Sequence, residues 1–311
     1  MKNLLKAIIF TGILTILVII SELLLISGLD IRKHGIFKSA NYELMGEKKD
    51  SIDVIFLGDS LIYSSISPME IWSNYGYTTF DCAEAAQVIP DAYNYLKFAI
   101  ENQHPKIIMM EASVIFRNPN KRKTTEKLAH YAKQFVPITK YHDNWKKYIS
   151  NGSKRRWVNP DKGYKYITDT KPSKNKDYMK YTEGYVPVLE ENMKYVKKIV
   201  KLCKDNDVKL VLISLPSQKT WFYRRHNTTE KIAKENDIEF IDFNLIDLGI
   251  DWETDTKDEG GHLNYLGAKK VSDYIGEYLK KTKLIEDHRN DKNYKSWYRA
   301  YNKYKKNSVN N

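Results

Sequence analysis

The feature that most constrains the fold is a series of short apolar runs. Three of them, "IDVIFLG" (52–58), "KIIMMEA" (106–112) and "KLVLISL" (209–215), are almost continuously hydrophobic. Such runs are typical of parallel strands that helices cover on both faces. Two shorter runs, "TTFDC" (78–82) and "EFIDF" (239–243), also read as strands. The chain therefore contains five candidate strands of one sheet.

Helical patterns separate these strands. They fall at residues 68–73, 91–102, 186–205, 228–235 and 264–281. Alternation of strands and helices predicts a doubly wound parallel sheet with helices on both faces. We therefore expect a three-layer α/β/α fold of the flavodoxin-like kind.

The N-terminus carries an apolar run from about Leu4 to Leu29. That length is enough to cross a hydrocarbon core of about 30 Å. Lys2 and Lys6 lie at its start, which places the N-terminus in the cytoplasm by the positive-inside rule. We expect a single-pass transmembrane anchor over residues 1–30 and an extracellular domain after it. A cleaved signal peptide is the alternative.

Two further regions stand apart from the alternating pattern. Residues 117–183 are rich in Lys, Tyr, Asn and Trp and are too long for a simple connection, so we interpret them as a functional, partly helical insertion in a domain spanning 31–283. The basic tail, 284–311, repeats aromatic residues at helical spacing. We expect this stripe to pack back on the domain, and the alternative is a position in the membrane interface.

The net charge of +12, from 51 Lys and Arg against 39 Asp and Glu, restricts the partners. An exported basic domain suits an anionic envelope polymer or lipid headgroups, whereas export argues against nucleic acid. Two cysteines are too few for a disulfide framework. No cluster of cysteine and histidine has the spacing of a metal site, so we expect neither a metal nor another cofactor.

The first strand ends in "IFLGDSLI", which presents Ser60 beside Asp59. Asp and Ser are good helix caps, but a serine at the carboxyl end of such a strand is also where α/β sheets place a nucleophile. Serine needs a base, and the base needs an acid that orients it. His262, in "DTKDEGGHLNYLGAKKV" (255–271), follows an acidic loop after the last strand. We expect Ser60 and His262 to meet at the carboxyl edge of the sheet.

The pair "GDSL" (58–61) and "DEGGHLN" (258–264) resembles the SGNH/GDSL hydrolase superfamily over roughly residues 50–282. Other stretches resemble its DltD-like, membrane-anchored branch, namely "FVPITKYHDNW" (135–145), "RRHN" (224–227) and "IDWETDTKDEGGHLNYLGAKK" (250–270). The resemblance implies an SGNH fold, Ser60 as nucleophile and His262 as base. It also implies O-acylation or deacylation of a cell-envelope polysaccharide or teichoic acid, with a membrane-bound O-acyltransferase as a partner.

The chain departs from the family pattern at two points. The family acid usually stands three positions before the histidine, which is Glu259 here, but resemblance to the branch favours Asp258, four before. The second-block glycine and third-block asparagine of the oxyanion hole are absent; "DCAEAAQVIPD" (81–91) and "EAS" (111–113) stand there. Backbone amides of Ser60 and of residues 83–86 are the candidate donors.

Five residues are candidate substrate contacts. Gln87 could contribute its side chain to the oxyanion hole, and Arg117, after the third strand, could meet an anionic group. His142 lies in the insertion; His226 and Asn227 follow the fourth strand. Each also has a structural interpretation: a surface salt bridge for Arg117, a hydrogen-bonded histidine for His142, and helix capping by Asn227.

These residues together predict a serine acyl-ester enzyme, an esterase or O-acyltransferase of the SGNH type, working through an acyl-serine intermediate. The alternative is a membrane-tethered, non-catalytic factor that binds or assembles the polymer on an inactive SGNH scaffold. The missing oxyanion residues favour this alternative, whereas the intact Ser60 and His262 oppose it.

Overall fold

A computed structural model describes residues 2–25, 43, 44, 46–119, 160–175 and 177–309. The chain divides into two compact units, Met1–Gly46 with Lys121–Val158, and Glu47–Asn120 with Asn159–Asn311. All the strands described below belong to the second unit.

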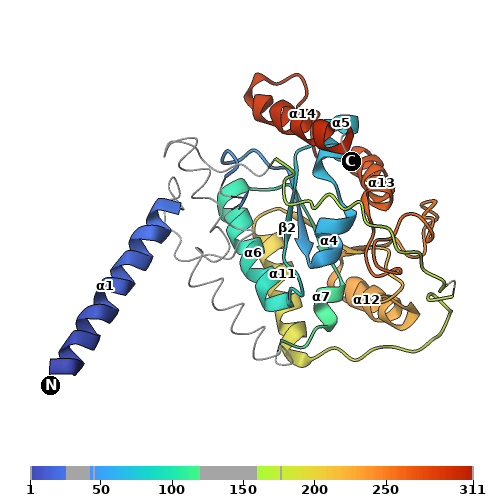
Figure 1. Ribbon diagram of the computed structural model, residues 1–311. Coiled ribbons are helices and arrows are strands. Elements are labelled where there is room, and N and C mark those ends of the chain that lie inside the picture. The colour runs from blue at the N-terminus through green and yellow to red at the C-terminus, as the bar shows by residue number, and fades with distance from the viewer. Residues whose placement is uncertain (1, 26–42, 45, 120–159, 176, 310–311) are drawn as a thin grey trace. The chain divides into compact units, whose positions relative to one another are not determined.

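The second unit is built on a five-stranded sheet in the order β2-β1-β3-β4-β5, in which every pair is parallel. The strands are β1 Val54–Gly58, β2 Thr79–Ala83, β3 Ile107–Glu111, β4 Lys209–Ser214 and β5 Glu239–Asp242 (Figure 1). Each lies within two residues of its predicted bounds. The predicted doubly wound parallel sheet is therefore confirmed.

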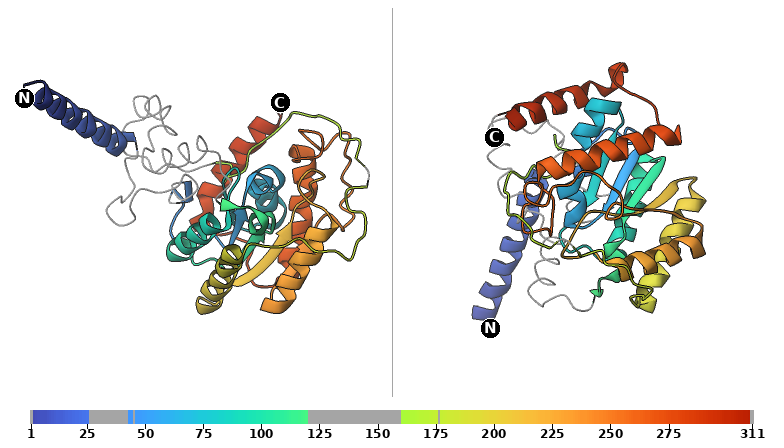
Figure 2. Two further views of the ribbon diagram at one scale, coloured as in Figure 1. Left: turned by 90° about the horizontal axis from the view of Figure 1, so that it is seen from below. Right: turned by 90° about the vertical axis from the view of Figure 1, so that its right-hand side faces the viewer.

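One face of the sheet is covered by α4 (Ser60–Ser65), α5 (Pro68–Tyr75) and α13 (Tyr265–Thr282) (Figure 2). Their apolar side chains pack on alternate residues of the central strands, because successive strand residues point to opposite faces. Phe56, Met109 and Ile213 lie on this face and are fully buried.

The opposite face is covered by α6 (Ile89–Gln103), α11 (Glu190–Asp205) and α12 (Tyr223–Asn236), with the short α7 (Ser113–Phe116) after β3. The helices lie where the sequence predicted them, with α12 beginning five residues earlier than the predicted range. The three layers α/β/α are thus complete.

The chain reverses its direction of winding at β1, which lies between β2 and β3. In open α/β sheets a ligand crevice forms at the carboxyl ends of strands where the order reverses. Ser60 follows β1 directly and Ser113 follows β3, so both lie at this position. Asp59 caps α4, because its carboxylate accepts a hydrogen bond from the backbone amide of Leu61 at 2.9 Å.

Residues 160–189, which we call the edge segment, cross the carboxyl edge of the sheet without forming a helix or strand in their described part, 160–175 and 177–189. Backbone hydrogen bonds join it in turn to α4, α13 and the loop before α13: Lys165 N to Tyr63 O, Tyr265 N to Ile167 O, Lys171 N to Thr256 O and Ser173 N to Trp252 O. The remainder of the predicted insertion, 120–159, lies outside the described residues, so its partial helicity stays a prediction.

The C-terminal tail forms a short 3₁₀ turn, η2 (Lys292–Tyr294), and α14 (Lys295–Val309). Trp297 and Tyr304 are buried, with Trp297 packing on Trp72 of α5 at a ring separation of 5.2 Å. The Tyr304 hydroxyl donates to Glu70 at 3.0 Å. The aromatic stripe therefore packs back on the domain, as predicted.

The first unit contains α1 (Lys2–Leu25), in which large apolar side chains such as Ile9, Ile13 and Leu17 are exposed. Among the helices in the described part of the chain, none combines the length and apolar character that crossing a bilayer requires.

Candidate active site

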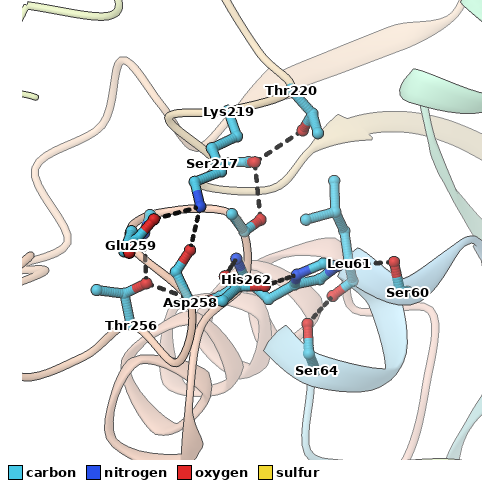
Figure 3. A network of polar contacts seen from close by, with 12 residues as sticks. Ser60, Leu61, Ser64, Ser217, Lys219, Thr220, Thr256, Asp258, Glu259 and His262 are labelled. Atoms are coloured by element: carbon cyan, nitrogen blue, oxygen red, sulfur yellow. Dashed lines mark hydrogen bonds and ion pairs between the residues drawn. The ribbon is translucent and has the colours of Figure 1, made fainter. Parts of the chain in front are cut away.

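Ser60, His262 and Asp258 form a continuous hydrogen-bonded chain (Figure 3). Ser60 Oγ lies 2.7 Å from His262 Nε2, and His262 Nδ1 lies 2.7 Å from Asp258 Oδ2. Ser60 is the first residue of α4, directly after β1, while His262 and Asp258 lie in the loop before α13. This is the geometry of a Ser–His–Asp triad, in which the acid fixes the tautomer of the base. The two halves predicted from the sequence do meet.

Two glycines allow the acid to fold back on its histidine. Gly260 has φ +85°, and a Cβ there would lie 2.6 Å from Gln218 Oε1. A Cβ on Gly261 would lie 2.8 Å from Asp258 Oδ1. Any larger residue at either position would push the loop outward. Gly261 is therefore required by the closeness of the Asp258 carboxylate, and Gly260 by its positive φ and the closeness of Gln218.

The structure separates the two candidate acids. Glu259 faces away from the imidazole and pairs with Lys219, whose Nζ lies 3.1 Å from Glu259 Oε2 (Figure 3). Lys219 also donates to the Asp258 carbonyl at 2.5 Å. Burial raises the pKa of Asp258, but its hydrogen bonds with His262 outweigh this and hold it below the usual range. Asp258 is thus the ionised partner of the base.

Side chains from a neighbouring loop hold the carbonyls of this turn. Ser217 Oγ donates to the Gly261 carbonyl at 2.8 Å, and Thr256 Oγ1 donates to the His262 carbonyl at 3.0 Å. Asn264 then caps α13 by accepting from the Leu266 amide at 3.0 Å. These hydrogen bonds fix the backbone before and after His262 and so hold its imidazole in place.

Asp59 stabilises the turn that carries the nucleophile. Its carboxylate is fully buried and accepts hydrogen bonds from Leu61 N and, at 3.2 Å, from Ser113 Oγ. Arg117 Nη2 pairs with the same carboxylate. Arg117, predicted as a substrate contact, thus bonds Asp59 and keeps 33% of its side chain exposed.

A second arginine lies near the first. Burial, and after it the positive charge of Arg117, lowers the pKa of Arg225. The Arg225 guanidinium lies over the rings of Phe116 and Phe222, at 5.1 and 5.2 Å from their centroids. The Nε atoms of both arginines are buried and have no hydrogen-bond partner in the part of the chain that the structure describes. Two cations therefore lie together at the edge of the sheet that carries Ser60.

Glu111 lies at the end of β3, behind the nucleophile. It is fully buried and accepts from the backbone amides of Ser113, at 3.1 Å, and Leu215, at 2.9 Å. Burial, and then the charge of Asp59, raises the pKa of Glu111 to about 8. A Cβ on Gly58 would lie 2.6 Å from the Glu111 Cβ, so only glycine allows this close packing.

Two backbone amides in the loop after β2, where oxyanion donors were predicted or could lie, already have acceptors within the domain. The amide of Glu84 donates to the Gly58 carbonyl at 3.2 Å, and that of Gln87 donates to the Glu84 carbonyl at 3.1 Å. Of the predicted loop amides, Glu84 is therefore engaged elsewhere. Ser113 lies in the "EAS" stretch that stands where the family has its third-block asparagine. Its hydroxyl donates to Asp59 and is therefore not directed at a substrate.

Gln87 keeps an uncommitted side chain. It is fully buried, and neither its Oε1 nor its Nε2 has a hydrogen-bond partner among the described residues. A buried amide without a partner is costly, about 1–3 kcal/mol. Gln87 follows β2, the strand beside β1, so its predicted role as a contact near the nucleophile stays a prediction.

The remaining predicted contacts have structural partners or lie outside the described residues. His226 Nδ1 lies 2.8 Å from Asp242 Oδ2. Asn227 donates to the carbonyls of Thr182, at 2.7 Å, and Gly184, at 2.9 Å, and so holds the edge segment. Helix capping by Asn227 is wrong, because α12 begins four residues earlier. His142 lies outside the described residues.

Sequence reasoning missed Tyr63, one turn after Ser60 on α4. Burial raises the pKa of Tyr63, and a hydrogen bond with Ser60 opposes that rise. The Lys165 ammonium lies 3.9 Å from the centre of the Tyr63 ring. Residues three apart on a helix share a face, so the spacing of Ser60 and Tyr63 was the available signal.

In the residues that the structure describes, no group of three or more His, Cys, Asp or Glu side chains could hold a metal ion. Ser60, His262 and Asp258 can together generate a nucleophilic hydroxyl, accept its proton and return it.

No protein-family profile matches the sequence, and comparison with curated proteins found no match. Solved structures with a similar fold include a psychrotrophic esterase from Pseudoalteromonas, 11% identical, covering 74% of this chain and 97% of that one with a TM-score of 0.39. A GDSL-like lipase from Bacteroides thetaiotaomicron is 13% identical, with 78% and 98% covered and a TM-score of 0.39.

A third is a family 3 carbohydrate esterase from Clostridium thermocellum, 12% identical, with 74% and 96% covered and a TM-score of 0.38. At such identities and TM-scores the similarity adds nothing to the assignment of the site. That assignment depends on the distances among Ser60, His262 and Asp258.

Proposed function

We propose that this protein is a serine enzyme acting on acyl esters. The observation that carries the proposal is the unbroken chain from Ser60 Oγ to His262 Nε2, and from His262 Nδ1 to Asp258, with 2.7 Å at each step. Because Asp59 caps α4, helix capping does not explain why an imidazole lies 2.7 Å from the Ser60 hydroxyl.

In the proposed reaction, Ser60 Oγ attacks the ester carbonyl carbon while His262 Nε2 takes its proton. The tetrahedral intermediate collapses to an acyl-serine, and the imidazolium gives the proton to the leaving alcohol. Water or a sugar hydroxyl then attacks the acyl-serine, with the proton passing through His262 again. Asp258, ionised, stabilises the imidazolium in both halves.

We infer that the substrate is an O-acylated polymer of the cell envelope, a polysaccharide or a teichoic acid. The apolar N-terminal run and its flanking lysines support a membrane anchor with the domain outside. Resemblance to the DltD-like branch supports a membrane-bound O-acyltransferase as the source of the acyl group.

The second candidate is a non-catalytic polymer-binding factor on the same scaffold. It is favoured by the third-block region, where Ser113 and Glu111 bond within the domain and offer no side-chain donor to an oxyanion. Losing one oxyanion donor typically lowers the rate by about 10²–10³. Such a loss weakens an enzyme without abolishing it.

Labelling with a fluorophosphonate probe tests the enzyme. The full-length protein in detergent is expected to be labelled, and Ser60→Ala is expected to be unlabelled. Ser64→Ala is a matched control, because Ser64 lies on the same helix but is fully buried. Absence of labelling in the wild type, with unchanged cellular function in Ser60→Ala, would favour the non-catalytic factor.

Hydrolysis and acyl transfer differ in whether water or a sugar hydroxyl accepts the acyl group, and an assay can distinguish them. An esterase is expected to release acetate rapidly from a small chromogenic acetate. A transferase is expected to hydrolyse it slowly and to form acylated product when an oligosaccharide is added. Mass spectrometry of the oligosaccharide distinguishes the two.

A further inference from the structure

The C-terminal helix presents a strongly basic face. From Lys292 to the end of the chain there are lysines and an arginine but no aspartate or glutamate. On α14, Trp297, Ala300 and Tyr304 face the domain, so Lys295, Arg299 and Lys306 fall on the opposite, exposed side. We call Lys292, Lys295, Arg299 and Lys306 the cationic face.

Within the part of the chain that the structure describes, no ion pair involves Lys292, Lys295, Arg299 or Lys306. Elsewhere on the surface, by contrast, lysines are paired along their helices, as Lys234 is with Glu230 at 3.1 Å. Asp291, an acid that lies at the start of η2 and lines the same surface, accepts from the Asn293 amide at 2.7 Å.

The first part of the face is concave. A shallow, open depression of about 590 Å³ is lined by Lys292, Lys295 and Arg299 together with Arg289, Asn290, Asp291 and Tyr298. Arg289 is already bonded to Asp287 at 2.6 Å and to the Ser73 carbonyl at 3.0 Å, so it forms a wall. Tyr298 is 41% exposed and offers an aromatic surface between cations.

The apolar side of α14 is not available for insertion into a membrane, because it packs against the domain. Trp297 is 1% exposed and Tyr304 is 5% exposed. A helix that lies in a bilayer interface buries its apolar face among the lipids. What remains outside on α14 is polar and basic, apart from the partly exposed rings of Tyr298 and Tyr301. This composition suits a soluble polyanion.

We propose that the cationic face binds an anionic polysaccharide, with one charged sugar in the depression beside Tyr298 and further charged groups along α14. From Lys295 to Lys306 the face extends about 16 Å, at 1.5 Å per residue, which is several sugar units. The proposal rests on the proposed function in one respect: the polymer held here would be the one that reaches Ser60.

The cationic face is separate from the triad. It begins at the N-terminal end of α14, where Trp297 and Tyr298 pack on Trp72. The opposite end of α14 approaches the triad side, since Tyr304 contacts Tyr166 and Tyr166 stacks on Tyr265 of α13. A polymer lying along α14 would therefore point toward the edge of the sheet that carries His262.

The test is binding of the full-length protein to alginate, a carboxylated polysaccharide, with neutral dextran as a control. We expect salt-sensitive binding to alginate and none to dextran, because exposed charges are screened by salt. Lys295→Glu/Arg299→Glu should weaken binding at least about tenfold. The matched pair Lys231→Glu/Lys234→Glu, on α12, makes the same change of net charge and should leave binding within about twofold.

Equal losses in the two double variants would overturn the proposal, because they would show attraction by net charge alone. Weaker binding of Lys295→Glu/Arg299→Glu to vesicles of phosphatidylglycerol and phosphatidylcholine, with unchanged binding to alginate, would also overturn it. Ser60→Ala should bind alginate normally, and Lys295→Glu/Arg299→Glu should hydrolyse a small acetate normally. Failure of the wild type to hydrolyse the acetate would thus contradict the proposed enzymatic function but not the proposed binding of polysaccharide by the cationic face.

Discussion

Asp258 accepts two hydrogen bonds from His262, one from the backbone amide and one from Nδ1, both at 2.7 Å. The same carboxylate therefore closes the turn and orients the ring. Because the two residues are only four apart, the position of the base relative to its acid is determined locally. Only the contact with Ser60 depends on the fold of the whole domain.

Asp258→Asn is expected to lower kcat by about 10³–10⁴, because an amide cannot stabilise the imidazolium and favours the wrong tautomer. Glu259→Gln is the matched change on the neighbouring residue. Since Glu259 bonds Lys219 and not the imidazole, it should change kcat by less than about threefold. Steady-state hydrolysis of a small acetate measures both. A larger loss in Glu259→Gln than in Asp258→Asn would show that the acid has been misassigned.

The pair of Asp59 and Arg117 predicts an effect on stability. Arg117→Met leaves a buried carboxylate with two neutral donors and is expected to lower the free energy of unfolding by about 1–3 kcal/mol. Denaturant unfolding measures it. The double variant Asp59→Asn/Arg117→Met should recover part of this loss, because the unpaired charge is gone. Additive losses in the double variant would show that the two side chains do not interact.

The strands and the triad were predictable because their signals are short and physical. Residues 106–112 are apolar on both faces, which requires a central parallel strand, and β3 occupies Ile107–Glu111. Ser60 and His262 were recognised because a nucleophile and a base stand at the ends of elements that a doubly wound sheet brings together. The sequence left Asp258 and Glu259 as candidates for the acid of the triad. The conformation of the Gly-Gly turn decides which of the two carboxylates reaches the His262 imidazole.

Other features could not be read from the sequence because they depend on contacts between distant segments. Arg117 was expected at the substrate, but its partner is set by the packing of β3 beside β1, which brings Asp59 within reach. Asn227 was a candidate substrate contact with helix capping as the alternative, yet the edge segment, about 45 residues away, supplies its carbonyl partners. The Tyr63 ring meets Lys165 only because that segment crosses over α4.

The high pKa of Glu111 predicts a pH dependence of stability. Its pKa is about 8 in the folded protein against 4.5 for the free side chain, so folding takes up a proton between these values. The free energy of unfolding should therefore fall as pH rises from about 5 to about 8, by up to about 1.4 kcal/mol per pH unit from this group. Glu111→Gln should remove that slope.

Glu111→Gln should be less stable than the wild type near pH 5, because one backbone amide then faces an NH₂ group, and this difference should shrink as the pH rises to about 8. Glu239→Gln changes a partly exposed acid on β5 and serves as the control that keeps the slope. Thermal unfolding at several pH values measures both variants. An unchanged slope in Glu111→Gln would assign the pH dependence to other groups.

Tyr63 predicts a catalytic effect that its neighbours do not share. Tyr63 lies one helical turn after Ser60 on α4, so Tyr63→Phe removes a hydroxyl close to the nucleophile. We expect kcat to fall by about tenfold with little change in KM, because a polar group near the nucleophile acts on the transition state more than on the bound ester. Tyr166→Phe is the matched control, since Tyr166 stacks on Tyr265 through its ring and that stacking survives. A rise in KM alone in Tyr63→Phe would show instead that the hydroxyl binds substrate and transition state equally, and an unchanged kcat would remove Tyr63 from the site.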